Sequence, residues 1–158
     1  MKKLKSIFAT IMLCIVCVAT MSSCSDNEDE PSIPAAKCVE GTYTGDMTCT
    51  VMGSDQVFDN VTVNVTTVDE STVNLSVSTF GNSPMQIPGI KIKAVKVSGA
   101  DGKYTFADTE FSSSTDTGKA YSGTLRGSFE NNTLTIEFNL HYGAMPMPMI
   151  CSITAPKK

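Results

Sequence analysis

The strongest constraint in this sequence of 158 residues is an alternation of apolar and polar side chains that recurs along most of the chain. In residues 60–66 and 72–78 an apolar Val or Leu stands at every second position, with Asn, Thr or Ser between. Successive side chains of a β-strand point to opposite faces, so this period predicts strands with one buried face. From Gly41 onward no segment keeps a helical period, which predicts an all-β domain.

Turn-forming residues divide this region into eight predicted strands. They cover residues 41–52, 57–68, 72–80, 87–98, 103–112, 119–130, 132–141 and 145–154. The short connections favour hairpins between sequence neighbours. The predicted fold is therefore an eight-stranded antiparallel up-and-down barrel over residues 41–155. The alternative is a β-sandwich, which would need Greek-key crossovers between two sheets.

The strand predicted at 119–130 alternates large and small residues on one face, with Gly123 and Gly127 between larger apolar side chains. Glycine weakens a strand, so its presence here has two interpretations. One is a tightly coiled interior that another backbone approaches closely, and the other is simple bends that fall in register.

The N-terminus has the three parts of a secretory signal: early lysines, an apolar stretch over residues 7–18, and small polar residues before Cys24. The apolar stretch is shorter than the ~20 residues that a membrane-spanning helix needs. The segment Met21-Ser22-Ser23-Cys24 resembles a bacterial lipobox, which implies cleavage after residue 23 and acylation of Cys24, with palmitate as a typical chain. Such chains contribute roughly 0.8 kcal/mol per buried methylene and would anchor the protein to a membrane.

Residues 24–40 are predicted to be a disordered tether, because the acidic run at 25–30 is followed by two prolines and little to bury. The acidic run also resembles the export signal of Bacteroidota-type lipoproteins. That resemblance implies an outer-membrane, lipid-anchored and surface-exposed protein.

Charge and cysteine content limit the possible partners and cofactors. Beyond Cys24 there are nine basic and 16 acidic residues, a net charge of −7, so nucleic acid is not an expected partner. Cys38, Cys49 and Cys151 remain after cleavage. Cys49 and Cys151 are a possible disulfide if the first and last strands are neighbours, and buried free thiols are the alternative. No C-x-x-C pair remains, so we expect no metal site.

Candidate chemistry is sparse. His141 is the single histidine, and no nucleophile-elbow pattern accompanies it, so we predict a solvated residue and no enzyme activity. Asp46 and Arg126 are expected to form at most a surface ion pair. Met145, Met147 and Met149, followed by Cys151, would share one face of the last strand; this suggests core packing, with a Cu(I) site as the alternative.

Four segments resemble the calycin-like β-barrel lipoproteins of the Bacteroidota: Gly41-Thr-Tyr-Thr-Gly45, residues 80–90, Gly102-Lys-Tyr-Thr-Phe106, and the closing apolar strand with its prolines. The similarity extends over residues 38–155. It implies a barrel like those of lipocalins and fatty-acid-binding proteins. The family has no common activity, so the resemblance supplies no catalytic residues and no cofactor.

Two functions remain open at this point. The first is an anchored barrel that binds a small apolar or amphipathic ligand among Tyr43, Met47, Leu125, Phe138 and Met147. The second is a non-enzymatic module for protein–protein interaction, such as an adhesin, inhibitor or accessory subunit, with a filled barrel and an exposed apolar patch.

Overall fold

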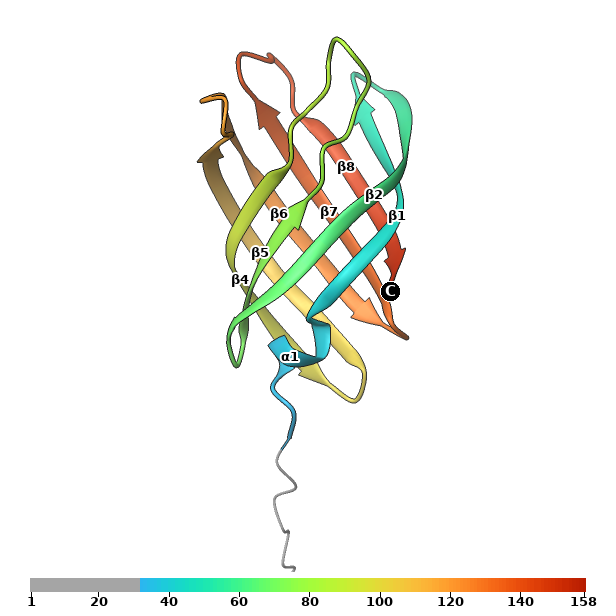
Figure 1. Cartoon of the computed structure of the whole chain (residues 1–158), viewed down its shortest axis with the longest axis vertical. Helices are drawn as coiled ribbons and strands as arrows, with labels where there is room; N and C mark the ends of the chain where they lie inside the picture. Colours follow the sequence, from blue (N-terminus) through green and yellow to red (C-terminus); the bar gives the residue numbers. More distant parts are fainter. Residues whose placement is uncertain (1–31) are drawn as a thin grey trace, which may run out of the picture. The chain divides into compact units, whose positions relative to one another are not determined.

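The strands close into a single barrel. The computed structural model describes residues 32–158. Its elements are α1 (Ala35–Val39), β1 (Gly41–Val51), β2 (Ser54–Asp69), β3 (Thr72–Val77), β4 (Ile90–Ala100), β5 (Lys103–Ser114), β6 (Ala120–Glu130), β7 (Thr133–Tyr142) and β8 (Met149–Pro156). Each strand pairs antiparallel with the next in sequence, and β8 returns to pair with β1 (Figure 1). The up-and-down barrel is confirmed, and the sandwich alternative is wrong.

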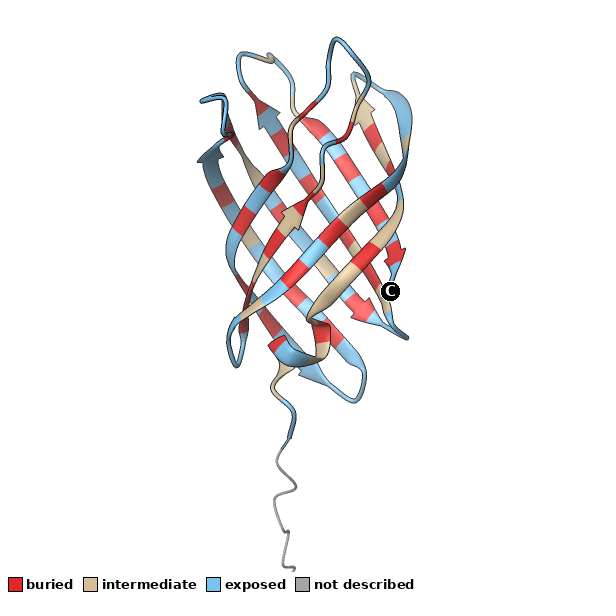
Figure 2. Ribbon diagram, viewed as in Figure 1, coloured by how far each residue is buried: buried red, intermediate tan, exposed pale blue. Residues whose placement is uncertain are grey.

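The core lies inside the barrel. Buried and exposed residues alternate along the strands, as the period-two pattern predicts (Figure 2). The buried side chains form one continuous hydrophobic cluster, to which every strand contributes. An eight-stranded barrel has an interior just wide enough for its own side chains to fill.

The two glycines of β6 mark places where neighbouring strands come very close. A Cβ at Gly123 would clash with the carbonyl oxygen of Asn139 and the ring of Phe111. At Gly127 it would lie 2.6 Å from the carbonyl oxygen of Thr135. The close backbone approach suggested by the large–small alternation is therefore present, and side chains at these positions would push β7 away from β6.

A short helix, α1, lies at one end of the barrel, which we call the base (Figure 1). Ala36 and Val39, three residues apart and so on one helical face, are fully buried. The compact unit begins at Ile33, earlier than the predicted boundary at Gly41. The helix was missed because five residues are too few to show a helical period. No helix in residues 32–158 is long and apolar enough to cross a membrane.

Hydrogen bonds hold α1 to the strands. The hydroxyl of Tyr43 donates to the carbonyl oxygen of Val39 at 2.6 Å, and the hydroxyl of Thr67 donates to that of Ala36 at 3.3 Å. The amide of Ala36 donates to the carbonyl oxygen of Glu70 at 3.1 Å. Carbonyls at a helix C-terminus have no partner within the helix, so these bonds satisfy groups that would otherwise need water.

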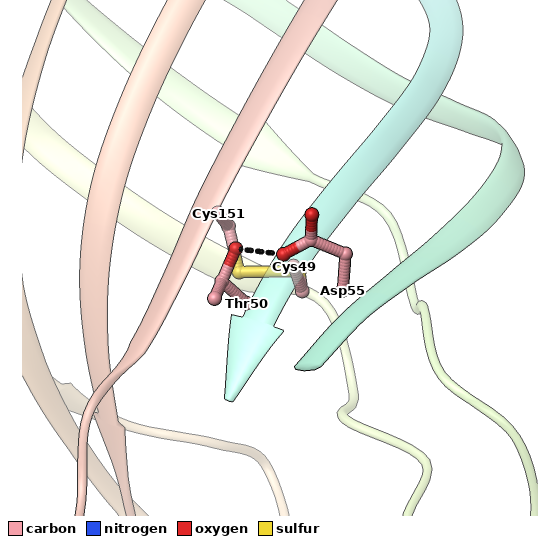
Figure 3. The surroundings of a disulfide bond; sticks show 4 residues. All are labelled: Cys49, Thr50, Asp55 and Cys151. Atoms are coloured by element: carbon pink, nitrogen blue, oxygen red, sulfur yellow. Dashed lines mark hydrogen bonds between the residues drawn. A yellow bond between two sulfur atoms is a disulfide. The ribbon is translucent and has the colours of Figure 1, made fainter. Parts of the chain in front are cut away.

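A disulfide joins the first and last strands. Residues 47–50 of β1 pair with residues 150–153 of β8, and this register places Cys49 directly opposite Cys151. The two form a disulfide across the closing seam, 102 residues apart in sequence (Figure 3). Cys38, on α1, is the free cysteine of the described residues. The sequence predicted this disulfide on the condition that the first and last strands are neighbours, and β1 and β8 are neighbours.

Removing the disulfide should destabilise the barrel. For the double variant Cys49→Ala/Cys151→Ala we expect the free energy of unfolding to fall by about 2–4 kcal/mol, because the bond restricts a long loop of the unfolded chain. Urea denaturation of the oxidised proteins measures the difference. Cys38→Ala is the control and should leave the midpoint unchanged; equal midpoints for all three proteins would contradict the prediction.

Tyr43 should make the fold sensitive to alkali. Burial raises the pKa of Tyr43 to about 12 from 10.0, so folding favours the neutral phenol. This contribution to stability is complete below about pH 10 and is lost as the pH rises through about 12. Tyr43→Phe should be less stable near pH 8, by about 1 kcal/mol for the lost hydrogen bond. The deficit should shrink in urea denaturation at increasing pH.

Tyr142→Phe, near the opposite end of the barrel, is the matched tyrosine control for this experiment. A stability difference between the parent protein and Tyr43→Phe that stays constant from pH 8 to pH 12 would show that ionisation of Tyr43 does not couple to folding.

Candidate interaction surface at the barrel mouth

Four of the five residues expected to surround a ligand instead pack against one another and their neighbours. Tyr43 and Met47 are 0% exposed, Leu125 is 1% and Phe138 is 2%. A side chain that lines a cavity large enough for water would have measurable exposed area. These four side chains have almost no exposed area, so they line almost no such cavity. The ring of Tyr43 also contacts that of Phe129 edge-on, with centroids 6.0 Å apart. These side chains fill the barrel.

The fifth residue, Met147, lies outside the barrel, so its predicted interior position is wrong. It is 48% exposed and belongs to the connection between β7 and β8, because β8 begins only at Met149. Pro146 and Pro148 lack the amide hydrogens that would extend the sheet in this direction. The predicted continuous face of methionines and Cys151 is therefore interrupted: Met149 and Cys151 point inward while Met147 faces solvent.

Four connections surround the end of the barrel opposite α1, which we call the mouth (Figure 1). They join β1 to β2, β3 to β4, β5 to β6, and β7 to β8. In the β3–β4 connection, Phe80 and Ile87 exchange backbone hydrogen bonds of 3.1 and 2.8 Å, and both side chains are buried. The ring of Phe80 lies 6.0 Å from that of Phe58 on β2. The connection therefore has an ordered stem anchored in the core.

Exposed apolar side chains gather at the mouth. Of the seven large hydrophobic residues that are exposed in the described chain, five lie near this end. We call these five the apolar rim: Met52, Val57, Met85, Met147 and Ile150. Ile150 is on β8, Val57 is on β2, and the three methionines are on three of the connections. These elements are neighbours around the barrel, because β8, β1, β2 and β3 are paired in that order. The remaining connection, between β5 and β6, consists of Thr, Asp, Gly and Lys residues.

The rim is held by local constraints. Met147 stands between Pro146 and Pro148, and Met85 directly follows Pro84. Proline fixes φ, which reduces the entropy that a loop loses when it binds a partner. Beside the β1–β2 turn, the Thr50 hydroxyl donates to the Asp55 carboxylate at 2.6 Å (Figure 3).

The polar residues singled out from the sequence lie on the outer faces of the strands. His141 is exposed on β7, opposite Ser122 of β6. The expected pairing of Arg126 with Asp46 is wrong, because Arg126 lies opposite Glu137 in the β6–β7 register and donates two hydrogen bonds to it, at 2.9 and 2.6 Å. These bonds to Glu137 raise the pKa of Arg126 above its ordinary value. An open groove of about 380 Å³ surrounds this ion pair on the outer face of β5–β7.

Comparison with known proteins identifies the fold. The family model described as "Calycin-like beta-barrel domain" matches residues 39–152. The chain belongs to this family. A solved structure of a provisionally assigned outer membrane protein from Bacteroides fragilis NCTC 9343 is similar, with 21% sequence identity and a TM-score of 0.70. The match covers 80% of this chain and 53% of that one, so this chain spans about half of that protein. No curated protein matches.

At 21% identity the solved structure establishes the shared fold alone. The anchor residue predicted from the sequence, Cys24, lies outside the described residues. Sequence reasoning placed four of the five interior residues correctly but missed Met52 and Met85, because single apolar residues in turns carry no periodic signal.

Proposed function

We propose that this calycin-like barrel is a lipid-anchored protein of the outer membrane that binds a protein partner through its apolar rim. The observation that carries the proposal is the contrast between its two apolar sets. The apolar side chains that point into the barrel pack against one another, whereas five large apolar side chains at the mouth are exposed. Of the two functions open from the sequence, this arrangement supports the interaction module better than the small-ligand carrier.

Apolar side chains kept exposed on one part of a surface favour recognition. Single exposed hydrophobic residues are ordinary, but a group of them usually marks a site of interaction. Three of the five are methionines, whose flexible and polarizable side chains adapt to the shape of a partner. A rigid barrel that carries such residues on its connections is a common arrangement for binding proteins.

The position of the rim suits an anchored protein. The described chain enters the barrel at the base, through α1, whereas the rim lies at the mouth (Figure 1). The compact unit begins at Ile33, so only residues 25–32 separate it from a lipid on Cys24. A chain of that length spans at most about 30 Å. An anchor at Cys24 would thus hold the base near the membrane and leave the rim accessible. The outer-membrane assignment of the similar protein from B. fragilis supports this location.

Replacing the predicted acylation site should release the protein from the membrane. We expect the native chain in the outer-membrane fraction and Cys24→Ala in the soluble fraction, because the lipid supplies the membrane affinity. Membrane fractionation and metabolic labelling with palmitate measure this. Cys38→Ala is the matched cysteine control and should stay labelled and membrane-bound. Labelling of Cys24→Ala at the native level would rule out this anchor.

The rim should form the contact with the partner. A photo-crosslinking residue placed at Met52 or Met147 in living cells should yield a discrete crosslinked species, and one placed at Thr105 or Thr135 on the outer face of β5–β7 should not. The Met52→Ser/Met147→Ser background should lower the yield from a probe at Met85 at least tenfold without changing thermal stability, since both side chains are exposed.

Two results would count against the rim. Equal crosslinking from the β5–β7 face would remove the distinction on which the proposal depends. Native mass spectrometry is the second check: we expect the barrel at the mass of the processed chain, and a small apolar molecule bound at one per chain would favour the carrier function instead.

A further inference from the structure

We infer that the segment recognised by the rim is both apolar and basic, with Lys or Arg beside its hydrophobic residues. This inference rests on the proposed function and names the chemistry of its partner. It follows from the distribution of charge on the strands that carry the rim.

The three strands at the closing seam carry no positive side chain. The sequences of β2, β1 and β8, which are adjacent in the barrel, contain no Lys, Arg or His. They contain four aspartates: Asp46, Asp55, Asp59 and Asp69. The exposed lysines at 91, 93 and 96 belong to β4, which is separated from β2 by β3. Three of the eight strands thus carry only acidic charge within their bounds, and they support most of the rim; Lys157, directly after β8, pairs with Tyr43 near the base.

The acidic and apolar side chains of this region are interleaved. Asp55, Val57 and Asp59 are alternate residues of β2, and all three are exposed. Residues two apart on a strand share a face and lie roughly 6–7 Å from each other. The Asp55 carboxylate accepts a hydrogen bond from the Thr50 hydroxyl, and Thr50 lies opposite Ile150 in the β1–β8 register. Val57 and Ile150, the two rim residues on these strands, therefore each lie near an aspartate. One bound segment could contact both the apolar side chain and the carboxylate.

In the described chain Asp46, Asp55 and Asp59 have no cationic partner, whereas Asp69, at the base end of β2, lies near Lys96 of β4. The ion pairs among residues 32–158 are Lys37–Glu40, Lys103–Glu130 and Arg126–Glu137, none of which is on β1, β2 or β8. Asp46 accepts only a backbone amide, from Asn60 at 3.2 Å. A basic segment would meet the unneutralised charges of Asp55 and Asp59 beside the rim, whereas an acidic segment would be repelled.

Lysine and arginine also match the spacing of this surface. Their aliphatic stems can cover Val57 or Ile150 while their charged ends reach the neighbouring aspartates. Apolar residues of the same segment would then contact Met52, Met85 and Met147. Such binding should weaken as salt screens the charges.

A random peptide library tests the chemistry without assuming a partner. The probe is a phage-displayed library of dodecapeptides, selected on the full chain purified as the cell processes it. We expect the enriched peptides to combine aromatic or aliphatic residues with a net positive charge. The leading peptide should bind at least tenfold more weakly to Asp55→Asn/Asp59→Asn and to the native protein at 300 mM rather than 50 mM salt.

The matched control removes two exposed carboxylates elsewhere. Asp108→Asn/Glu110→Gln, on β5, should bind the leading peptide as the native protein does. Equal weakening by both pairs would indicate an effect of net charge alone and overturn the inference. So would basic peptides whose binding is unchanged in Asp55→Asn/Asp59→Asn.

The remaining outcomes separate this inference from the proposed function. Neutral or acidic peptides that lose binding in Met52→Ser/Met147→Ser would overturn the basic chemistry while supporting the rim as a site. Failure to enrich any peptide, or enrichment of peptides insensitive to both the aspartate and the methionine variants, would overturn the inference. The crosslinking experiment in cells would still decide independently whether the rim binds a partner.

Discussion

The pairing of β8 with β1 is the contact on which the rest of the molecule depends. It converts a meander of hairpins into a closed surface, which removes the sheet edges and gives every strand one inward and one outward face. The contact is short in register, residues 47–50 with 150–153, and it contains the Cys49–Cys151 disulfide. Without it the inward valines, leucines and isoleucines of eight strands would have no common interior.

Closure also explains which parts of the fold could be predicted from the sequence. A strand with one dry face must alternate, so the runs around Val63, Leu75 and Ile136 were recognisable, and the inward positions of Tyr43 and Phe138 followed from the same parity. The Cys49–Cys151 pair could be named only as a condition, because it requires β1 and β8 to be neighbours. That adjacency is a property of the closed topology, and no local pattern encodes it.

The parts that could not be predicted are those where local pattern and tertiary environment disagree. Met145, Met147 and Met149 alternate like a strand, but the prolines between them prevent pairing, and only Met149 joins β8. The α1 helix is too short for a period and is held by tertiary bonds such as that from Tyr43 to Val39. The rim depends on where turns place Met52 and Met85, which residue type alone does not specify.

The disulfide connects the stability of the barrel to the proposed binding surface. Cys49 is three residues before Met52, and Cys151 directly follows Ile150, so the covalent bond lies at the roots of two segments that carry rim residues. The Thr50–Asp55 hydrogen bond constrains the β1–β2 turn at the same height (Figure 3). Exposed methionines are individually flexible, so a rim built from them needs a rigid support to keep its members in a fixed arrangement. A filled core and a cross-linked seam supply that support, so the packed interior is consistent with the proposed binding at the rim.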